Sequence, residues 1–124
     1  MIKLLLVDDD PNVLCGLRMR LALEPDISVV GEAYNGACAI RQTETLHPDI
    51  VVMDLQMPEM DGLQAAIALR ERARAARIIM LSIRDDPATR EEAARAGVRG
   101  FVGKHQSVDS LVAAIRDVVR EPAT

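Results

Sequence analysis

Five short aliphatic runs alternate with longer stretches of helical periodicity, and this alternation constrains the fold of the chain more than any other feature. Each run is short, mostly apolar and typical of a buried strand; the runs occupy residues 2–7, 27–33, 50–53, 78–81 and 98–102. The stretches between them repeat apolar residues three and four apart, as Leu14, Leu17 and Leu21 do, which predicts amphipathic helices. Repeated strand-then-helix units favour right-handed crossovers. We therefore expect an α/β fold with a five-stranded parallel sheet and helices on both faces.

Helix ends carry local signals of their own. Asp10 and Asp86 each stand directly before a proline, so the carboxylate can cap a helix whose first turn holds the proline. Ser107 is a third predicted cap, and Gly97 stands where a helix should end. These signals predict three helix starts and one helix end.

Chain length limits the number of domains. With 124 residues and 49% hydrophobic composition, the chain suits one domain with a single sizeable core. We expect that domain to cover residues 1–120. Residues 121–124 then form a tail or the start of a linker.

The charge and composition of the chain exclude several partners. A net charge of -4, with one Tyr and one Phe, argues against a nucleic-acid surface. No apolar run approaches the ~18 residues of a membrane span, so we expect no membrane contact. Cys15 and Cys38 lack metal-site spacing and fit the thiols of a reducing compartment. We expect a cytoplasmic protein in which any DNA contact belongs to another domain.

Polar residues follow the predicted strands directly, where each strand ends. The carboxyl ends of parallel strands meet at one edge of a sheet, which is where open α/β sheets bind ligands. Taken singly, these residues have ordinary interpretations, such as helix cap, turn residue, local hydroxyl or surface cation. Taken together, they predict a site; they are Asp8, Asp9, Asp10, Asp54, Ser82 and Lys104.

The three carboxylates of Asp8, Asp9 and Asp54 should repel one another, since the first and third strands are neighbours in a doubly wound sheet. Two such charges about 4 Å apart repel by ~4 kcal/mol at an effective dielectric near 20. Carboxylate oxygens without His or Cys suit Mg²⁺, which also accepts phosphate oxygens. We therefore predict a Mg²⁺ site that handles phosphate, with Lys104 and Ser82 as donors to the phosphate.

The segments "LLLVDDD", "DLQMPEMDG", "MLS" and "GFVGK" resemble the receiver domain of two-component response regulators. This resemblance implies a flavodoxin-like sheet of strand order 2-1-3-4-5. It implies that Asp54 is the phosphoacceptor and that Asp8, Asp9 and the carbonyl of Gln56 complete the Mg²⁺ site. By the same resemblance, Ser82 and Lys104 bind the phosphoryl group, and Phe101 is the aromatic residue that rotates when the switch operates.

The stretch "EPDISVVGEAYNGACAI", with Ser82 and His105, is similar to receivers of the NarL/FixJ type. That similarity implies a signalling protein rather than an enzyme, which accepts a phosphoryl group from a sensor histidine kinase. It also implies a following helix-turn-helix domain that binds DNA, and it leaves a phosphorylation-dependent homodimer open. Many receivers have Pro, often with a cis bond, where this chain has His105; a cis Lys104–His105 bond would cost ~2.5 to 4 kcal/mol.

Three alternatives compete with this interpretation. A Mg²⁺-dependent aspartyl phosphatase of the haloacid-dehalogenase type needs a second acid two residues after the nucleophile, where this chain has Gln56. A flavin-binding flavodoxin relative needs a loop that cradles phosphate, which three aspartates would repel. A stand-alone receiver, acting in a phosphorelay or by protein contact, shares the predicted chemistry and stays open.

Overall fold

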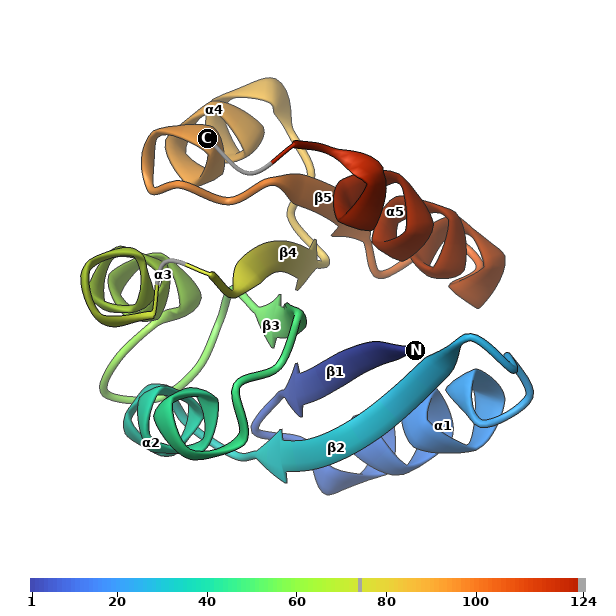
Figure 1. Ribbon diagram of the computed structural model, residues 1–124. Coiled ribbons are helices and arrows are strands. Elements are labelled where there is room, and N and C mark those ends of the chain that lie inside the picture. The colour runs from blue at the N-terminus through green and yellow to red at the C-terminus, as the bar shows by residue number, and fades with distance from the viewer. Residues whose placement is uncertain (74, 123–124) are drawn as a thin grey trace.

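The computed structural model describes residues 1–73 and 75–122 as an α/β fold around one parallel sheet (Figure 1). The strand order is β2-β1-β3-β4-β5, which confirms the expected sheet. The strands are β1 (Ile2–Val7), β2 (Ile27–Ala33), β3 (Ile50–Asp54), β4 (Arg77–Ser82) and β5 (Gly100–Gly103). The helices are α1 (Pro11–Leu21), α2 (Gly36–Leu46), α3 (Gly62–Arg72), α4 (Pro87–Arg95) and α5 (Val108–Arg120).

Both faces of the sheet are covered, which explains why its strands are mostly apolar. On one face, Leu4 and Leu6 of β1 pack with α1 and α5. On the other face, Leu5 and Val7 pack with α2 and α3. Successive side chains of a strand point to opposite faces, so one strand supplies both layers.

Two strand ends differ from the sequence prediction in a way that matters for the site. β3 continues to Asp54 and β4 to Ser82, so both polar residues are held within the hydrogen-bonded sheet. β5 begins at Gly100, two residues later than predicted, and ends at Gly103. Its pairing with β4 starts at Ile79 because the chain is still leaving the turn at Gly97, which has a positive φ of 95°.

The predicted helix caps are partly confirmed. Asp10 accepts a hydrogen bond from the amide of Asn12, and Asp86 accepts one from the amide of Thr89. Ser107 occupies the predicted cap position of α5, but its side chain makes no capping hydrogen bond. The predicted position is therefore confirmed, and the predicted capping contact is wrong. Within residues 1–73 and 75–122, no helix has the length and apolar character needed to span a membrane.

Candidate functional site at the carboxyl edge of the sheet

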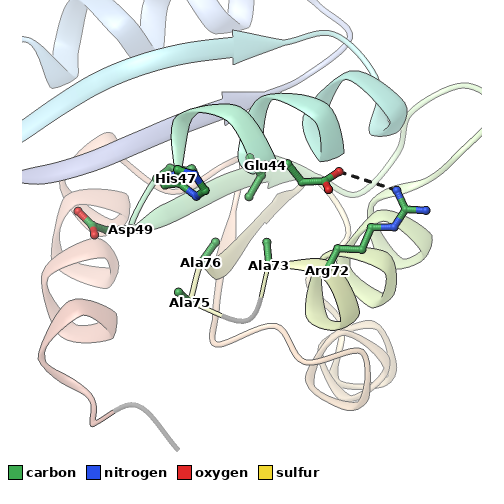
Figure 2. A pocket seen from close by; sticks show the side chains of 9 residues that line it. Glu44, His47, Asp49, Arg72, Ala73, Ala75 and Ala76 are labelled. Atoms are coloured by element: carbon green, nitrogen blue, oxygen red, sulfur yellow. Dashed lines mark ion pairs between the residues drawn. The ribbon is translucent and has the colours of Figure 1, made fainter.

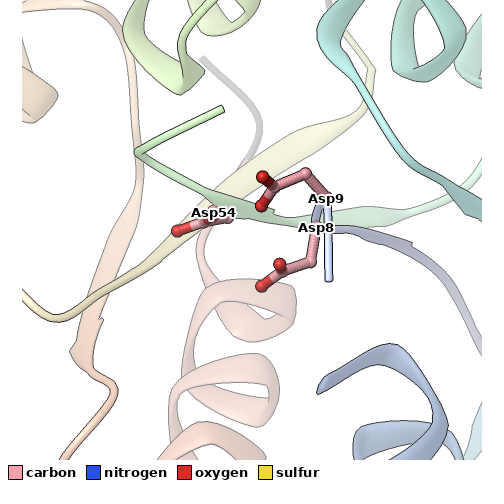
Figure 3. A group of neighbouring side chains, drawn as sticks. All are labelled: Asp8, Asp9 and Asp54. Carbon is pink, nitrogen blue, oxygen red and sulfur yellow. The ribbon is translucent and has the colours of Figure 1, made fainter. Parts of the chain in front are cut away.

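Asp8, Asp9 and Asp54 gather at the carboxyl edge of the sheet, as their sequence positions predicted (Figure 3). Val7 of β1 lies opposite Met53 of β3, so the residue after each is brought to the same place. One carboxylate oxygen from each of the three aspartates lies within 4.8 Å of the others. The fold therefore creates the acidic cluster by pairing β1 with β3.

The three aspartates differ in their surroundings. Asp8 and Asp54 are 2% and 6% exposed, whereas Asp9 is exposed to solvent. Asp8 accepts hydrogen bonds from the backbone amide of Asp10 at 2.9 Å and from Lys104 Nζ at 3.0 Å. Asp54 Oδ1 lies 3.2 Å from Lys104 Nζ and accepts a longer bond, 3.4 Å, from the amide of Gln56. Asp9 is thus the member of the cluster that faces incoming solutes.

Lys104 is the cation of the site, and its backbone is fixed to the neighbouring strand. Its amide donates to the carbonyl oxygen of Ser82 at 2.7 Å, and the Lys104–His105 bond is trans. Burial lowers the pKa of Lys104, but the hydrogen bond to Asp8 and the charge of Asp54 outweigh burial and leave the pKa raised. The lysine is therefore charged at neutral pH.

The surroundings of the Asp54 carboxyl disfavour its ionised form. Burial raises the pKa of Asp54, the nearby charge of Asp8 adds to the increase, and Lys104 offsets only part of it. An ionised Asp54 is therefore held at a cost to the folded state. A cation at the cluster would lower that cost.

Ser82 is fully buried at the end of β4, one position beyond the residue that pairs with Asp54. Its hydroxyl oxygen accepts a hydrogen bond from the amide of Arg84 at 3.0 Å. A hydroxyl has a donor as well as two acceptor positions. Ser82 can therefore hold its own loop and donate to another group.

Phe101 lies on β5 opposite Met80 and is half-buried on the side where α4 packs. The guanidinium carbon of Arg90 on α4 lies 4.8 Å from the centre of the phenyl ring, a cation–π distance. The ring therefore packs toward α4, the helix that follows Ser82. Arg90 itself was not predicted, because no sequence signal connects it to Phe101.

Gln56 is exposed on an open groove of about 560 Å³ beside the aspartates. Asp9 and Arg84 also line this groove, together with Thr89 and Glu92 of α4. The sequence missed Arg84, although its place two residues after Ser82 was an available signal. The groove gives solutes access to the exposed side of the acidic cluster.

A second pocket, of about 280 Å³, lies at the opposite edge of the sheet (Figure 2). It is bordered by the ends of α2 and α3, where Glu44 and Arg72 form an ion pair at 3.8 Å. His47 and Asp49, which precede β3, also line it. None of the predicted site residues contributes to this pocket.

The donor set of the acidic cluster fits Mg²⁺. Asp8, Asp9 and Asp54 offer hard carboxylate oxygens from a cluster that contains neither His nor Cys. Asp9 and Gln56 are exposed, so water molecules and a phosphate could complete the coordination from the groove. These residues could therefore hold a Mg²⁺ ion, which would offset the repulsion between the three carboxylates.

Fold and site together define a flavodoxin-like α/β domain with an acidic cluster and a paired lysine at the switch point of its sheet. The family model of the response regulator receiver domain matches residues 4–116, and the chain belongs to that family.

Relatives of the NarL type lie within this family. The nitrate/nitrite response regulator protein NarL of Escherichia coli K12 is 36% identical to the chain over 112 residues, 90% of this chain and 52% of NarL. The DNA-binding transcriptional activator EvgA of the same strain is 34% identical over 111 residues, 90% of this chain and 54% of EvgA. The chain therefore spans about half the length of these relatives.

Solved structures agree with this assignment. A two-component response regulator of the LuxR family from Aurantimonas sp. SI85-9A1 is 36% identical, with a TM-score of 0.91 over 94% of this chain and 84% of that one. The response regulator domain of Thermotoga maritima CheB is 28% identical, with a TM-score of 0.91 over 98% of each chain. The chain is thus a receiver domain in both sequence and fold.

Proposed function

We propose that the chain is a phosphorylation-dependent switch whose phosphoacceptor is Asp54. The observation that carries this proposal is the position of the Asp54 carboxylate, which ends β3 and lies 3.2 Å from Lys104 Nζ beside Asp8 and Asp9. A strand end holds a nucleophile rigidly, and an adjacent cation favours its ionised form.

The transfer step uses the carboxylate as nucleophile. An oxygen of Asp54 attacks the phosphorus of a phosphohistidine on a sensor histidine kinase, and the new O–P bond forms as the P–N bond breaks. The electron pair of that bond returns to the imidazole nitrogen of the kinase. Lys104 then pairs with the phosphoryl oxygens, since its ammonium already reaches Asp54.

A Mg²⁺ ion held by Asp8, Asp9, Asp54 and the carbonyl of Gln56 would neutralise negative charge on the phosphoryl group during transfer. Side chains of the protein position the lysine and bind the phosphoryl group. Asp8 holds Lys104 in place through its 3.0 Å hydrogen bond. Ser82 donates its hydroxyl to the phosphoryl group, and Phe101 responds to that movement.

The output is proposed from the relatives. By name, EvgA is a DNA-binding transcriptional activator and NarL is a nitrate/nitrite response regulator, and the part of each that matches this chain is about half of its length. We infer that residues 1–120 act as the receiver of such a regulator, with residues 121–124 leading into a helix-turn-helix domain that binds DNA. The chain would then be a regulated acceptor and not a turnover enzyme. A homodimer formed after phosphorylation is a further proposed partner.

A cytoplasmic location goes with this proposal. Cys15 and Cys38 are free thiols, as a reducing compartment favours.

Intact-mass measurement after incubation with acetyl phosphate and Mg²⁺ tests the proposal. The wild-type chain should gain one phosphoryl group, and Asp54→Asn should gain none. Asp117→Asn, which removes a carboxylate that is 75% exposed on α5, is the matched control and should react like the wild type. A phosphoryl group on the Asp54→Asn chain would exclude Asp54 as the acceptor.

A further inference from the structure

Asp85 joins two loops that border the proposed phosphorylation site. It lies in residues 83–86, the β4–α4 loop, and its Oδ2 is 3.4 Å from Nε2 of His105 in the β5–α5 loop, residues 104–107. The carbonyl oxygen of Asp85 accepts a hydrogen bond of 3.0 Å from Nε of Arg90 on α4. We call Asp85, Arg90 and His105 the Asp85 clamp.

Gly103 provides the space that the clamp needs. A Cβ atom at Gly103 would lie 2.6 Å from Cε1 of His105 and 2.9 Å from Oδ2 of Asp85. Both distances are shorter than a non-bonded contact allows, so with any side chain at position 103 the His105 ring and the Asp85 carboxylate would have to shift. The contact between His105 and Asp85 in its present geometry therefore depends on the glycine at position 103.

The clamp also reaches Phe101. Arg90 covers the Phe101 ring with its guanidinium group while the same side chain bonds the backbone of Asp85. One arginine thus connects the β4–α4 loop to the aromatic residue on β5. Movement of the loop would change what covers the ring.

Ser82 connects the other end of this loop to the phosphorylation site. Its hydroxyl accepts from the amide of Arg84, and it keeps a proton to donate. If Ser82 donates to a phosphoryl group on Asp54, the amide of Arg84 moves with it. That movement pulls on the next residue, Asp85, which the clamp holds.

The geometry points to a clamp that opposes switching: His105 and Arg90 hold Asp85, and with it the β4–α4 loop, in the arrangement that phosphorylation must change. This inference rests on the proposed function of Asp54 and adds the residues that set the threshold for its effect. Releasing the clamp raises the fraction of unphosphorylated protein in the responding arrangement, which strengthens apparent phosphoryl-analogue binding.

The expected effect is modest. The side chains of His105 and Asp85 are 65% and 36% exposed, and exposed pairs contribute little to stability. Loss of the pair should therefore lower the half-saturating concentration of beryllofluoride by about two- to fivefold.

A double-mutant cycle on the 124-residue chain tests the clamp. The variants are His105→Ala, Asp85→Ala and the double variant, each titrated with beryllofluoride and Mg²⁺ by NMR, with the amide of Phe101 as the readout. Each single variant should reach half-saturation at a lower beryllofluoride concentration than the wild type. The double variant should lower this concentration no further than one single variant does, because both substitutions remove the same contact. His105→Gln, which keeps an N–H donor, should fall between His105→Ala and the wild type.

The outcomes separate the two proposals. If the wild type itself shows no response to beryllofluoride, the proposed function fails, and the clamp fails with it. If the wild type responds but the variants saturate at its concentration or above, the function stands and the clamp is wrong. Additive effects of the two single variants would show that His105 and Asp85 act separately, which also rejects the clamp.

Discussion

Lys104 Nζ lies 3.2 Å from Asp54 Oδ1, although Asp54 ends β3 and Lys104 follows β5, two strands away across the sheet. The same ammonium group is 3.0 Å from Asp8, so one cation serves both buried carboxylates. Two negative charges share one positive charge, and Asp9 adds a third negative charge at the solvent side. This imbalance is the physical basis of the first two predictions.

Asp54→Asn should stabilise the chain in the absence of Mg²⁺. Asparagine has the shape of aspartate without its charge, so it removes the repulsion from Asp8 and the cost of burying the carboxylate. We expect the free energy of unfolding at pH 7 to rise by on the order of 1 kcal/mol, measured by urea denaturation.

The pH dependence follows from the raised pKa of Asp54, which burial causes and Asp8 increases. A carboxyl group whose pKa is raised by folding stabilises the folded state when the pH is below its ordinary pKa, near 3.8. This stabilisation is lost as the pH rises through the pKa of the folded state. The advantage of Asp54→Asn should therefore shrink as pH falls toward that range. Asp117→Asn should show no such trend, and a less stable Asp54→Asn chain at pH 7 would contradict the argument.

Asp9→Asn should weaken Mg²⁺ binding by roughly tenfold or more, since even outer partners of metal ligands commonly contribute that much. The neighbouring substitution Asp10→Asn is the matched control because it removes the same charge one residue away. Asn caps a helix about as well as Asp, so α1 should keep its cap in the control. Equal Mg²⁺ affinities of the two variants in an NMR titration would show that bulk charge, and not coordination by Asp9, determines binding.

Gly62→Ala should destabilise the chain by about 2 kcal/mol, as overpacking of a tight contact commonly does. A Cβ at Gly62 would lie 2.5 Å from the carbonyl oxygen of Asp54 and 2.9 Å from Cα of Leu55. Both are backbone atoms, so the end of β3 must shift, and phosphorylation of Asp54 should slow as well.

Gly16→Ala provides the contrasting variant. Gly16 lies within α1, and a Cβ there meets no atom within 4 Å. Alanine should stabilise this helix by roughly 0.5 to 1 kcal/mol. Thermal unfolding should therefore show a lower midpoint temperature for Gly62→Ala and a higher one for Gly16→Ala. A Gly62→Ala variant of unchanged stability would show that the β3–α3 loop is looser than its geometry indicates.

The sequence predicted the strands well because a sheet covered on both faces needs apolar residues at most strand positions. Strand order is not encoded in that pattern, since it depends on contacts between distant segments, and it followed only from the resemblance to receivers. The late start of β5 was missed because Val98 is apolar but still belongs to the turn that Gly97 begins.

The composition of the site was predictable for a similar reason. Asp8, Asp54, Ser82 and Lys104 follow or end strands, and parallel strands bring those positions together. The contact between Asp85 and His105 was not predictable, because it depends on two loop conformations and on the space above Gly103. The same holds for Arg90, which meets Phe101 only through the packing of α4 against β5.

The last prediction concerns how a phosphoryl group at Asp54 changes the surface of the molecule. Ser82→Ala should still be phosphorylated, because the nucleophile, the acidic cluster and Lys104 remain. The variant should nevertheless show a weaker chemical-shift response at Phe101 when beryllofluoride binds. A methyl group can neither donate to the phosphoryl group nor accept from the amide of Arg84, so the link to the β4–α4 loop is lost.

Ser82→Thr is the variant that separates this link from a simple loss of packing. Threonine keeps the hydroxyl and adds a methyl group at a fully buried position, so it should preserve most of the response even if it lowers stability. Alanine should do the reverse, with a small loss of stability and a large loss of response. If Ser82→Ala responds as fully as the wild type, the signal from Asp54 reaches Phe101 without the hydroxyl. The charge of Lys104, whose backbone amide is bonded to the carbonyl oxygen of residue 82 in either variant, would then be the remaining connection between the phosphoryl group and β5.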